Sequence, residues 1–184
     1  MLILASKSER RIKLLKDIGL EFKAVAHNVD ESYDPKQAPQ TIVQKLSKRK
    51  AEGVLKEYPH DTVIAADTFV VFEETILGKP KNEDEAFEML KKLSGKKHEV
   101  YTGVTIVNKQ RSKTFYSVSS VYMKPYNDIE IYEYIKTQEP LDKAGAYAIQ
   151  GKGSKLVEKY TGDFFTIVGL PLKELQKELK KFDY

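Results

Sequence analysis

The stretch TVIAADTFVVF, at residues 62–72, decides the fold class of this 184-residue chain. It is β-branched and apolar almost throughout, which predicts a buried central strand. A second strand-like run at residues 1–5 is followed by helix-spaced apolar residues up to Gly19, which predicts a strand followed by a helix. Hairpin signals at residues 72–77 and 100–123 lie among such units. We therefore expect an α/β protein with a mixed sheet.

The rest of the chain alternates between helical and strand patterns. Helices are expected at residues 40–58, from an Asn82 cap to Gly95, at 127–137, and after Pro171; strands at 21–27, 155–160 and 164–168; and a glycine-bearing loop at 142–153. No repeat, linker or low-complexity tract divides these elements. We therefore expect one domain over residues 1–184.

Composition excludes several classes of protein. The chain has 31 basic and 27 acidic side chains, a net charge of +4, and no cysteine, so disulfides, thiolate metal sites and a cysteine nucleophile are ruled out. No apolar run approaches the roughly 20 residues that span a bilayer, and the apolar start precedes its charges, the reverse of a signal peptide. We expect a cytoplasmic protein without a membrane partner. The basic residues are scattered and matched by acids, which disfavours nucleic acid as a partner.

The junction LASKSERR places a helix start directly after a strand. Free backbone N–H groups and the helix dipole favour an anion at such a place. Ser6 and Ser8 add hydroxyl donors, and Arg10 and Arg11 add guanidinium groups suited to phosphate oxygens. The alternative is a capping box formed by Ser6 and Glu9, which needs no ligand. Two adjacent arginines oppose the helix dipole, so we favour the anion site.

Asp67 interrupts the apolar run at residues 62–72. A buried carboxylate is costly unless it is paired, hydrogen-bonded or bound to a metal; a bulge that lets it bond the backbone is the alternative. Possible partners are Glu31 in a polar loop, Lys50 in the segment SKRKAE, and Lys79 in a Gly-Lys-Pro turn. Because magnesium prefers one or two carboxylates with phosphate oxygens, these residues make a magnesium–phosphate site possible.

The segment DKAGAYAIQG carries two glycines close to Gln150. The amide of Gln150 has both donors and an acceptor, as reading a base edge requires, although an ordinary turn is the alternative. His27, His60 and His98 lack metal-ligand spacing, so we interpret each as structural or exposed.

Taken together, LASKSERR, Glu31, KRKAE, AADTFV, GKP, SGKKHEVYTGV, EPLDKAGAYAIQG and VGLP occur in an order that resembles the Maf family along nearly the whole chain. The resemblance implies metal-dependent hydrolysis of nucleoside triphosphates to monophosphate and pyrophosphate, with magnesium or manganese as the divalent cation. It also implies nucleotide-pool housekeeping and a possible homodimer. The implied fold is two-lobed and similar to that of inosine-triphosphate pyrophosphatases, with the active site in the cleft between the lobes.

The resemblance also assigns roles to residues. Asp67 resembles the family's catalytic proton acceptor, Glu31 its partner at the metal. Residues that match the phosphate-binding set are Ser6, Arg11, Lys50 and Lys79, with Ser8 beside them. Arg10, Thr68 and Gln150 match positions that distinguish subgroups, and this combination resembles the branch acting on dTTP and UTP. Glu9 departs from the pattern, because the family usually has proline there; we expect the helix to form nevertheless.

Two other functions stay open at this point. One is a pyrophosphatase for noncanonical purine nucleotides such as ITP, given the shared fold. The other is a non-catalytic nucleotide-binding regulator of septum formation, which would need no acidic pair. The presence of both Glu31 and Asp67 favours catalysis.

Overall fold

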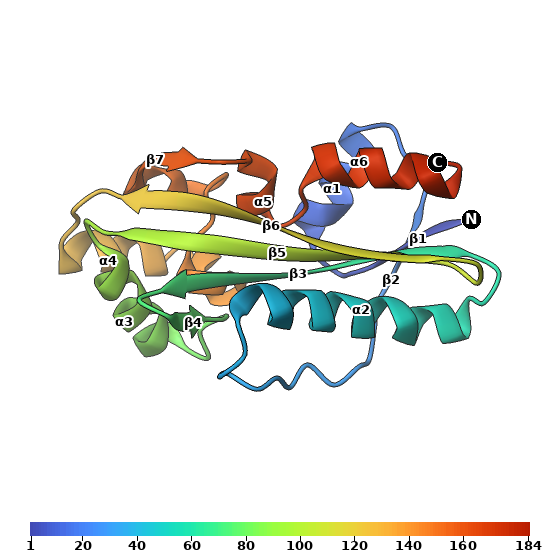
Figure 1. Cartoon of the computed structure of the whole chain (residues 1–184). Coiled ribbons are helices and arrows are strands. Elements are labelled where there is room, and N and C mark those ends of the chain that lie inside the picture. The colour runs from blue at the N-terminus through green and yellow to red at the C-terminus, as the bar shows by residue number, and fades with distance from the viewer. The chain divides into compact units, whose positions relative to one another are not determined.

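The computed structural model describes residues 1–184 (Figure 1). The chain divides into two compact units: the first comprises Met1–Thr68, Thr102–Ser117 and Gly169–Tyr184, and the second Phe69–Tyr101 and Val118–Val168.

The strands form one mixed seven-stranded sheet, as the sequence predicts. They are β1 (Leu2–Ala5), β2 (Lys23–Val25), β3 (Thr62–Phe72), β4 (Thr75–Leu77), β5 (Lys97–Val107), β6 (Ser112–Met123) and β7 (Val157–Thr161). Their order is β2-β1-β3-β5-β6-β7, with β4 on β3. β1 runs parallel to β2 and β3, whereas β4 is antiparallel to β3 and β7 is antiparallel to β6.

Six α-helices and four short 3-10 helices complete the chain. The α-helices are α1 (Glu9–Asp17), α2 (Pro39–Glu57), α3 (Glu83–Leu93), α4 (Asp128–Ile135), α5 (Phe164–Val168) and α6 (Leu172–Leu179). The 3-10 helices are η1 (Glu139–Asp142), η2 (Ala144–Ala146), η3 (Lys152–Leu156) and η4 (Lys180–Phe182). No helix is both long enough and apolar enough to cross a membrane.

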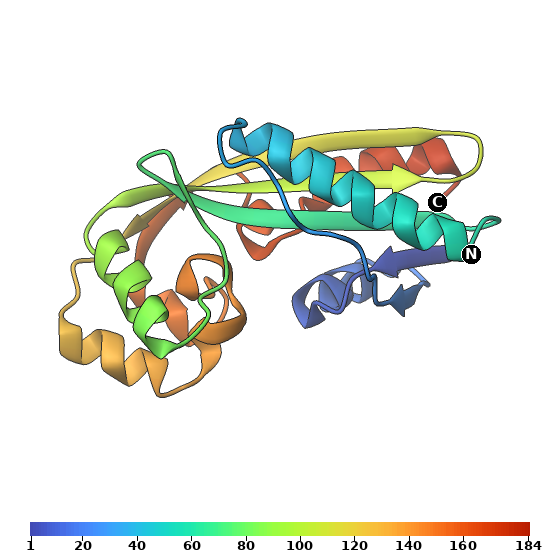
Figure 2. The ribbon, with the colours of Figure 1, turned by 90° about the horizontal axis from the view of Figure 1, so that it is seen from below.

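In the first unit, the long helix α2 packs tightly on the sheet (Figure 2). A Cβ atom on Gly103 of β5 would lie 2.4 Å from the backbone carbonyl of Val43, so only glycine allows this close approach. Nearby, the Ser47 and Thr105 hydroxyls lie 2.9 Å apart and are buried. This packing fixes the face of α2 that carries Lys50, which is itself buried.

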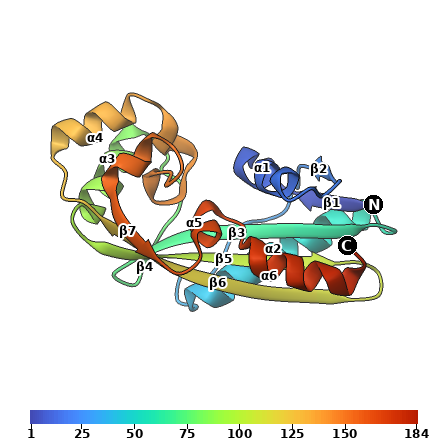
Figure 3. The same ribbon diagram turned by 90° about the horizontal axis from the view of Figure 1, so that it is seen from above.

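In the second unit, α3 and α4 pack together beside the 3-10 helices (Figure 3). Their apolar side chains form one core with Val70 and Phe72 of β3. His98 is buried at the edge of this core, and its Nε2 lies 2.6 Å from the hydroxyl of Tyr147. The segment after α4 is therefore anchored by both apolar and polar contacts.

One predicted strand is wrong. Residues Phe164–Val168 form the short helix α5 instead. The carboxylate of Asp163 accepts hydrogen bonds from the Phe165 N–H and the Thr166 hydroxyl, both at 3.1 Å, which is how a helix start is capped. A five-residue apolar run has no readable period, so this local cap decides its structure. The strand expected at 155–160 is shifted, because η3 occupies Lys152–Leu156 and β7 begins at Val157.

Candidate active site

The start of α1 is not capped by the Ser6–Glu9 capping box that was the alternative to an anion site. The N-cap of α1 is Ser8, whose Oγ accepts the Arg11 N–H at 3.5 Å. The Ser6 hydroxyl accepts the Ser8 N–H at 3.1 Å, so the Ser6–Glu9 capping box does not form. Glu9 is the first helical residue, and the helix forms with glutamate at that position as expected. Ser6 is buried, and the two hydroxyls lie at the N-terminus of α1.

Arg11 is held in place on two sides. Its Nε donates to the Gly169 carbonyl at 2.8 Å, and its Nη2 donates to the Thr68 hydroxyl at 3.0 Å. The Thr68 hydroxyl also lies 2.9 Å from that of Thr102. Desolvation lowers the pKa of Arg11 to about 10, although the charge of Asp67 opposes this shift. The guanidinium therefore stays charged at neutral pH, and its Nη1 remains available for another acceptor.

Asp67, Lys50 and Glu31 form the centre of the candidate site. Asp67 and Lys50 are 8% and 5% exposed, and the ammonium of Lys50 donates to Asp67 Oδ1. The same ammonium lies 3.1 Å from Glu31 Oε1, so it bridges the two carboxylates. The second oxygen of Asp67, Oδ2, is buried without any hydrogen-bond partner. The carboxylate thus pairs with a side chain from α2 and not with the backbone of a bulge.

The loop that carries Glu31 is tied down by residues that the sequence analysis missed. Arg49 Nη1 donates to the carbonyls of Asp30 and Ser32, at 2.5 and 2.9 Å. The Asp30 carboxylate accepts the Ser32 hydroxyl and N–H, and these bonds lower the pKa of Asp30. Arg49 precedes Lys50 on α2, so one helix holds both the loop and its carboxylate. The charged segment SKRKAE was the only signal in the sequence.

His27 also lies at this site, which the sequence analysis did not predict. Its Nε2 is 3.6 Å from Glu31 Oε1, and its Nδ1 is buried without a partner. Burial, followed by the positive charge of Lys50, lowers the pKa of His27, which favours a neutral imidazole. The four-residue spacing from Glu31 was the available signal, but the segment is not helical, so spacing alone did not indicate the contact.

The residues present fit a divalent cation of the magnesium type. The unpartnered Oδ2 of Asp67 and the exposed carboxylate of Glu31 are hard oxygen ligands. No group of three or more His, Asp and Glu side chains is arranged to hold a metal ion alone. Magnesium commonly takes one or two protein carboxylates and completes its shell with water and substrate phosphates, so two carboxylates are enough for such an ion.

Not every predicted residue belongs to the first unit. Ser6, Ser8, Arg10, Arg11, Glu31, Lys50, Asp67 and Thr68 do, whereas Lys79 and Gln150 belong to the second. Lys79 is exposed in the segment after β4. Gln150 is exposed. It lies within a turn that is closed by a hydrogen bond from the Gly151 N–H to the Ala148 carbonyl at 3.3 Å. The turn alternative for this segment is therefore correct as local structure, and it leaves the Gln150 amide accessible.

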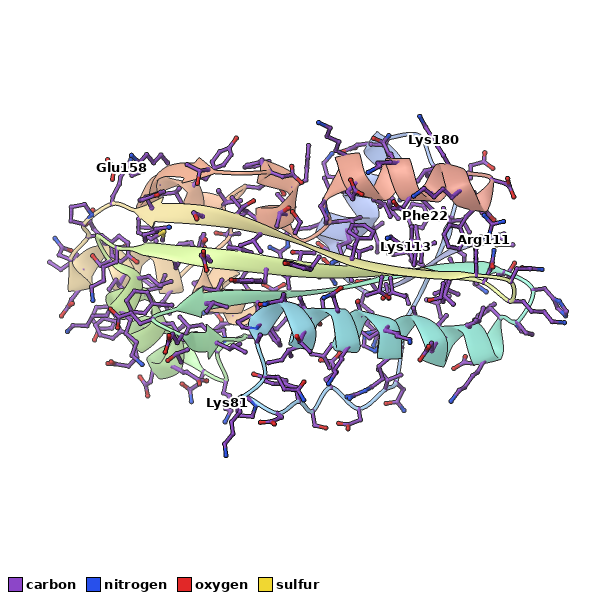
Figure 4. The ribbon with its side chains drawn as sticks, viewed as in Figure 1. Phe22, Lys81, Arg111, Lys113, Glu158 and Lys180 are labelled. Atoms are coloured by element: carbon purple, nitrogen blue, oxygen red, sulfur yellow. The ribbon has the colours of Figure 1, made fainter.

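Part of the basic charge in the first unit comes from elements that carry none of the candidate site residues. Arg111 and Lys113 come from the start of β6 and its preceding turn, and Lys180 follows α6 (Figure 4). The Arg111 side chain is used locally, since it donates to the Lys181 carbonyl and lies over the Phe182 ring, 5.6 Å from its centroid.

The fold and these residues define an α/β protein with a buried carboxylate, a bridging lysine and a fixed arginine. Comparison with known proteins agrees: the family described as "Maf-like protein" matches residues 1–182, and the chain belongs to this family. A dTTP/UTP pyrophosphatase of Caldicellulosiruptor bescii is 52% identical, over 100% of this chain and 95% of that protein. One of Bacillus cereus (strain G9842) is 47% identical over 99% and 95%.

A solved structure supports the fold independently. The Staphylococcus aureus Ham1 protein matches with a TM-score of 0.54 over 98% of both chains. The sequence identity is 14%, so the likeness shows a shared fold and nothing more. The predicted α/β fold class is confirmed.

Proposed function

We propose that this protein hydrolyses dTTP, UTP and related modified pyrimidine nucleotides to the nucleoside monophosphate and pyrophosphate. The observation that carries the proposal is the buried Asp67 carboxylate, with one oxygen on Lys50 and the other without a partner. The relatives named dTTP/UTP pyrophosphatase, which match nearly the whole chain, support the choice of reaction and substrate. In a cell, this activity would remove modified nucleotides from the precursor pool.

Asp67 and Glu31 would hold a divalent cation, magnesium or manganese. When bound, such an ion lowers the pKa of a coordinated water and neutralises phosphate charge. Lys50 holds both carboxylates at one place, because its ammonium contacts each of them.

The reaction forms a bond between a water oxygen and the α-phosphorus and breaks the bond from that phosphorus to the bridging oxygen. Asp67 accepts the proton from the attacking water. The pyrophosphate leaves with the bridging oxygen. Arg11, Lys50 and Lys79 stabilise the negative charge that develops on it, and Ser6 and Ser8 donate hydrogen bonds to the phosphates.

Selection of the base falls to Gln150, with Arg10 and Thr68. The amide of Gln150 matches the donors and acceptors of a uracil or thymine edge. A site that hydrogen-bonds one base edge rejects others, because mismatched polar groups stay unpaired.

The proposal is tested by following pyrophosphate release from dTTP for the wild type, Asp67→Asn and Glu31→Gln. We expect turnover to fall by about 10²- to 10⁴-fold in Asp67→Asn, the range for loss of a general base. Glu31→Gln provides a second test on a more exposed side chain, which is less important for folding. Glu52→Gln is the control, because Glu52 is half-exposed on the same helix as Lys50 and pairs only with Lys48. Near-normal turnover in folded Asp67→Asn would overturn the assigned role.

The substrate and metal are tested with dTTP, UTP, CTP, GTP, ITP and 7-methyl-GTP, with and without a chelator. We expect dTTP and UTP to be preferred, and activity to disappear on chelation and return with added magnesium or manganese. A preference for ITP would favour the purine pyrophosphatase. Tight dTTP binding without hydrolysis, with the metal present, would favour the non-catalytic regulator.

A further inference from the structure

The turn that presents Gln150 is held at both ends by one pair of side chains. Its first residue is Ala148, and the chain leaves it through Gly151, whose N–H closes the turn at 3.3 Å. The second unit contains all residues concerned. Gln150 itself is exposed, so its direction depends on how firmly the backbone on either side is fixed.

Tyr134 of α4 holds the entry to the turn. Its hydroxyl accepts the Ala148 N–H at 3.1 Å and donates to Glu139 Oε2 at 2.5 Å. Tyr134 is 6% exposed, and burial, followed by the bond to Glu139, raises its pKa. The hydroxyl therefore keeps its proton at physiological pH and remains a donor to the carboxylate.

Glu139 of η1 holds the exit from the turn. Its Oε1 accepts the Lys152 N–H at 3.1 Å, and its Oε2 accepts the Gly153 N–H at 2.9 Å. With the Tyr134 hydroxyl, this carboxylate receives three donors. Hydrogen bonds to a charged acceptor are stronger than neutral ones, so the exit is held by strong bonds.

The glycines around Gln150 are what allow this contact. A Cβ atom on Gly151 would lie 1.8 Å from Glu139 Oε1, and one on Gly153 would lie 2.5 Å from the Tyr134 hydroxyl. Any other residue would therefore displace the carboxylate or the phenol. The glycine spacing in AIQGKG is explained by the approach of these two side chains to the backbone.

We propose that Tyr134 and Glu139 are positioning residues that fix Gln150 for selection of the nucleotide base. This inference rests on the proposed function, and it adds two residues that do not touch the substrate. A group that reads a base edge discriminates well only when it is fixed before binding, since a loose group adapts to several edges. The pair supplies this rigidity from elements that flank the turn.

The test compares Glu139→Gln and Tyr134→Phe with the wild type. Glutamine keeps the size of the side chain but replaces one carboxylate oxygen with an NH2 donor. That donor would face another donor, either a backbone N–H or the Tyr134 hydroxyl. Tyr134→Phe keeps the ring and removes the shared hydroxyl. The control is Glu133→Gln, because Glu133 is exposed on the same helix and pairs with Lys136.

We expect the ratio of kcat/KM for dTTP to that for CTP to fall by about 10- to 100-fold in both variants, since a misplacement of about 1 Å can cost 10²-fold. The loss should appear mainly as a higher KM for dTTP, with kcat changing less, because the hydrolytic residues are untouched. Amide hydrogen exchange at Lys152 and Gly153 should become faster. The control should change none of these quantities.

A double-mutant cycle provides a sharper readout. Gly151→Ala should lower the dTTP-to-CTP ratio in the wild-type background, because the added methyl would meet Glu139. In a Glu139→Ala background the same substitution should cause little further loss. Additive losses in the dTTP-to-CTP ratio would show that Gly151 and Glu139 act separately and would overturn the positioning role of Glu139.

Failure of this inference differs from failure of the proposed function. If the wild type hydrolyses neither dTTP nor UTP, the proposed function fails. Unchanged amide exchange at Lys152 and Gly153 in the variants would separately overturn the positioning role of Tyr134 and Glu139. If the wild type is active and the folded variants keep its substrate ratio, the inference alone is overturned. An equal loss of kcat for every nucleotide would show a purely structural role and would also overturn it.

Discussion

Asp67 and Glu139 are two carboxylates with opposite surroundings. Asp67 lies inside a central strand, with one oxygen on Lys50 and the other buried without a partner. Glu139 lies in a short 3-10 helix, and its two oxygens accept three hydrogen bonds. An unsatisfied buried oxygen costs stability, whereas a fully bonded carboxylate holds the chain around it. This difference fits the roles we propose, in which Asp67 is available for chemistry and Glu139 positions the backbone around it.

Removing Lys50 is expected to have the largest effect. In Lys50→Met, the buried Asp67 carboxylate loses its only hydrogen-bond partner. We expect the free energy of unfolding to fall by about 3–5 kcal/mol, the range for breaking a buried ion pair, and pyrophosphate release to be lost. Urea unfolding measures the first effect. The double variant Lys50→Met, Asp67→Asn should recover part of the stability, and an unchanged urea midpoint in Lys50→Met would contradict the account.

His98 also has a buried unpartnered atom, Nδ1, but its other ring nitrogen lies beside the Tyr147 hydroxyl and not beside an ammonium. Desolvation lowers its pKa from 6.5 to about 4. Between these values the unfolded chain binds a proton that the native chain does not, so stability falls as the pH falls. The expected slope is about 1.4 kcal/mol per pH unit from this group.

His98→Gln should remove that part of the pH dependence between pH 6.5 and 4, measured by urea unfolding across the range. The exposed His60, changed to glutamine, is the control and should leave the slope as it is in the wild type. Turnover of dTTP by folded His98→Gln should stay close to normal, because His98 has a structural role. An identical pH slope in wild type and His98→Gln would contradict this account.

The smallest effect is expected at Glu9, where the family usually has proline. Glu9 is the first residue of α1, and Ser8 before it has φ −66° and ψ 113°, a conformation that a following proline permits. Glu9→Pro should raise the free energy of unfolding by about 0.4–1 kcal/mol, because proline restricts the unfolded chain. Thermal unfolding measures it, and a loss of stability would show that this N-terminus has another geometry.

Much of the fold could be predicted from the sequence where the pattern was long or strongly punctuated. The strand at 62–72 and the return strand at 75–77 agree with β3 and β4, and the helix predicted at 40–58 is α2 at Pro39–Glu57. The stretch at 164–168 could not be predicted, because five apolar residues fit either structure and a cap from Asp163 decides.

The candidate site was predictable in its residue types and less so in its contacts. Asp67 stood out because a carboxylate in an apolar strand needs a partner, and Lys50 is that partner. His27, Arg49 and Glu139 were missed, because their roles depend on loop contacts that only tertiary structure brings together. Periodicity reports which face of an element is buried, and it contains no information on such contacts.

We propose that water, activated at Asp67, attacks the α-phosphorus. The most direct measurement is hydrolysis of dTTP by the wild type in water labelled with heavy oxygen, followed by mass spectrometry of both products. We expect the label to enter dTMP and pyrophosphate to stay unlabelled. Label in pyrophosphate, or formation of dTDP and orthophosphate, would contradict it.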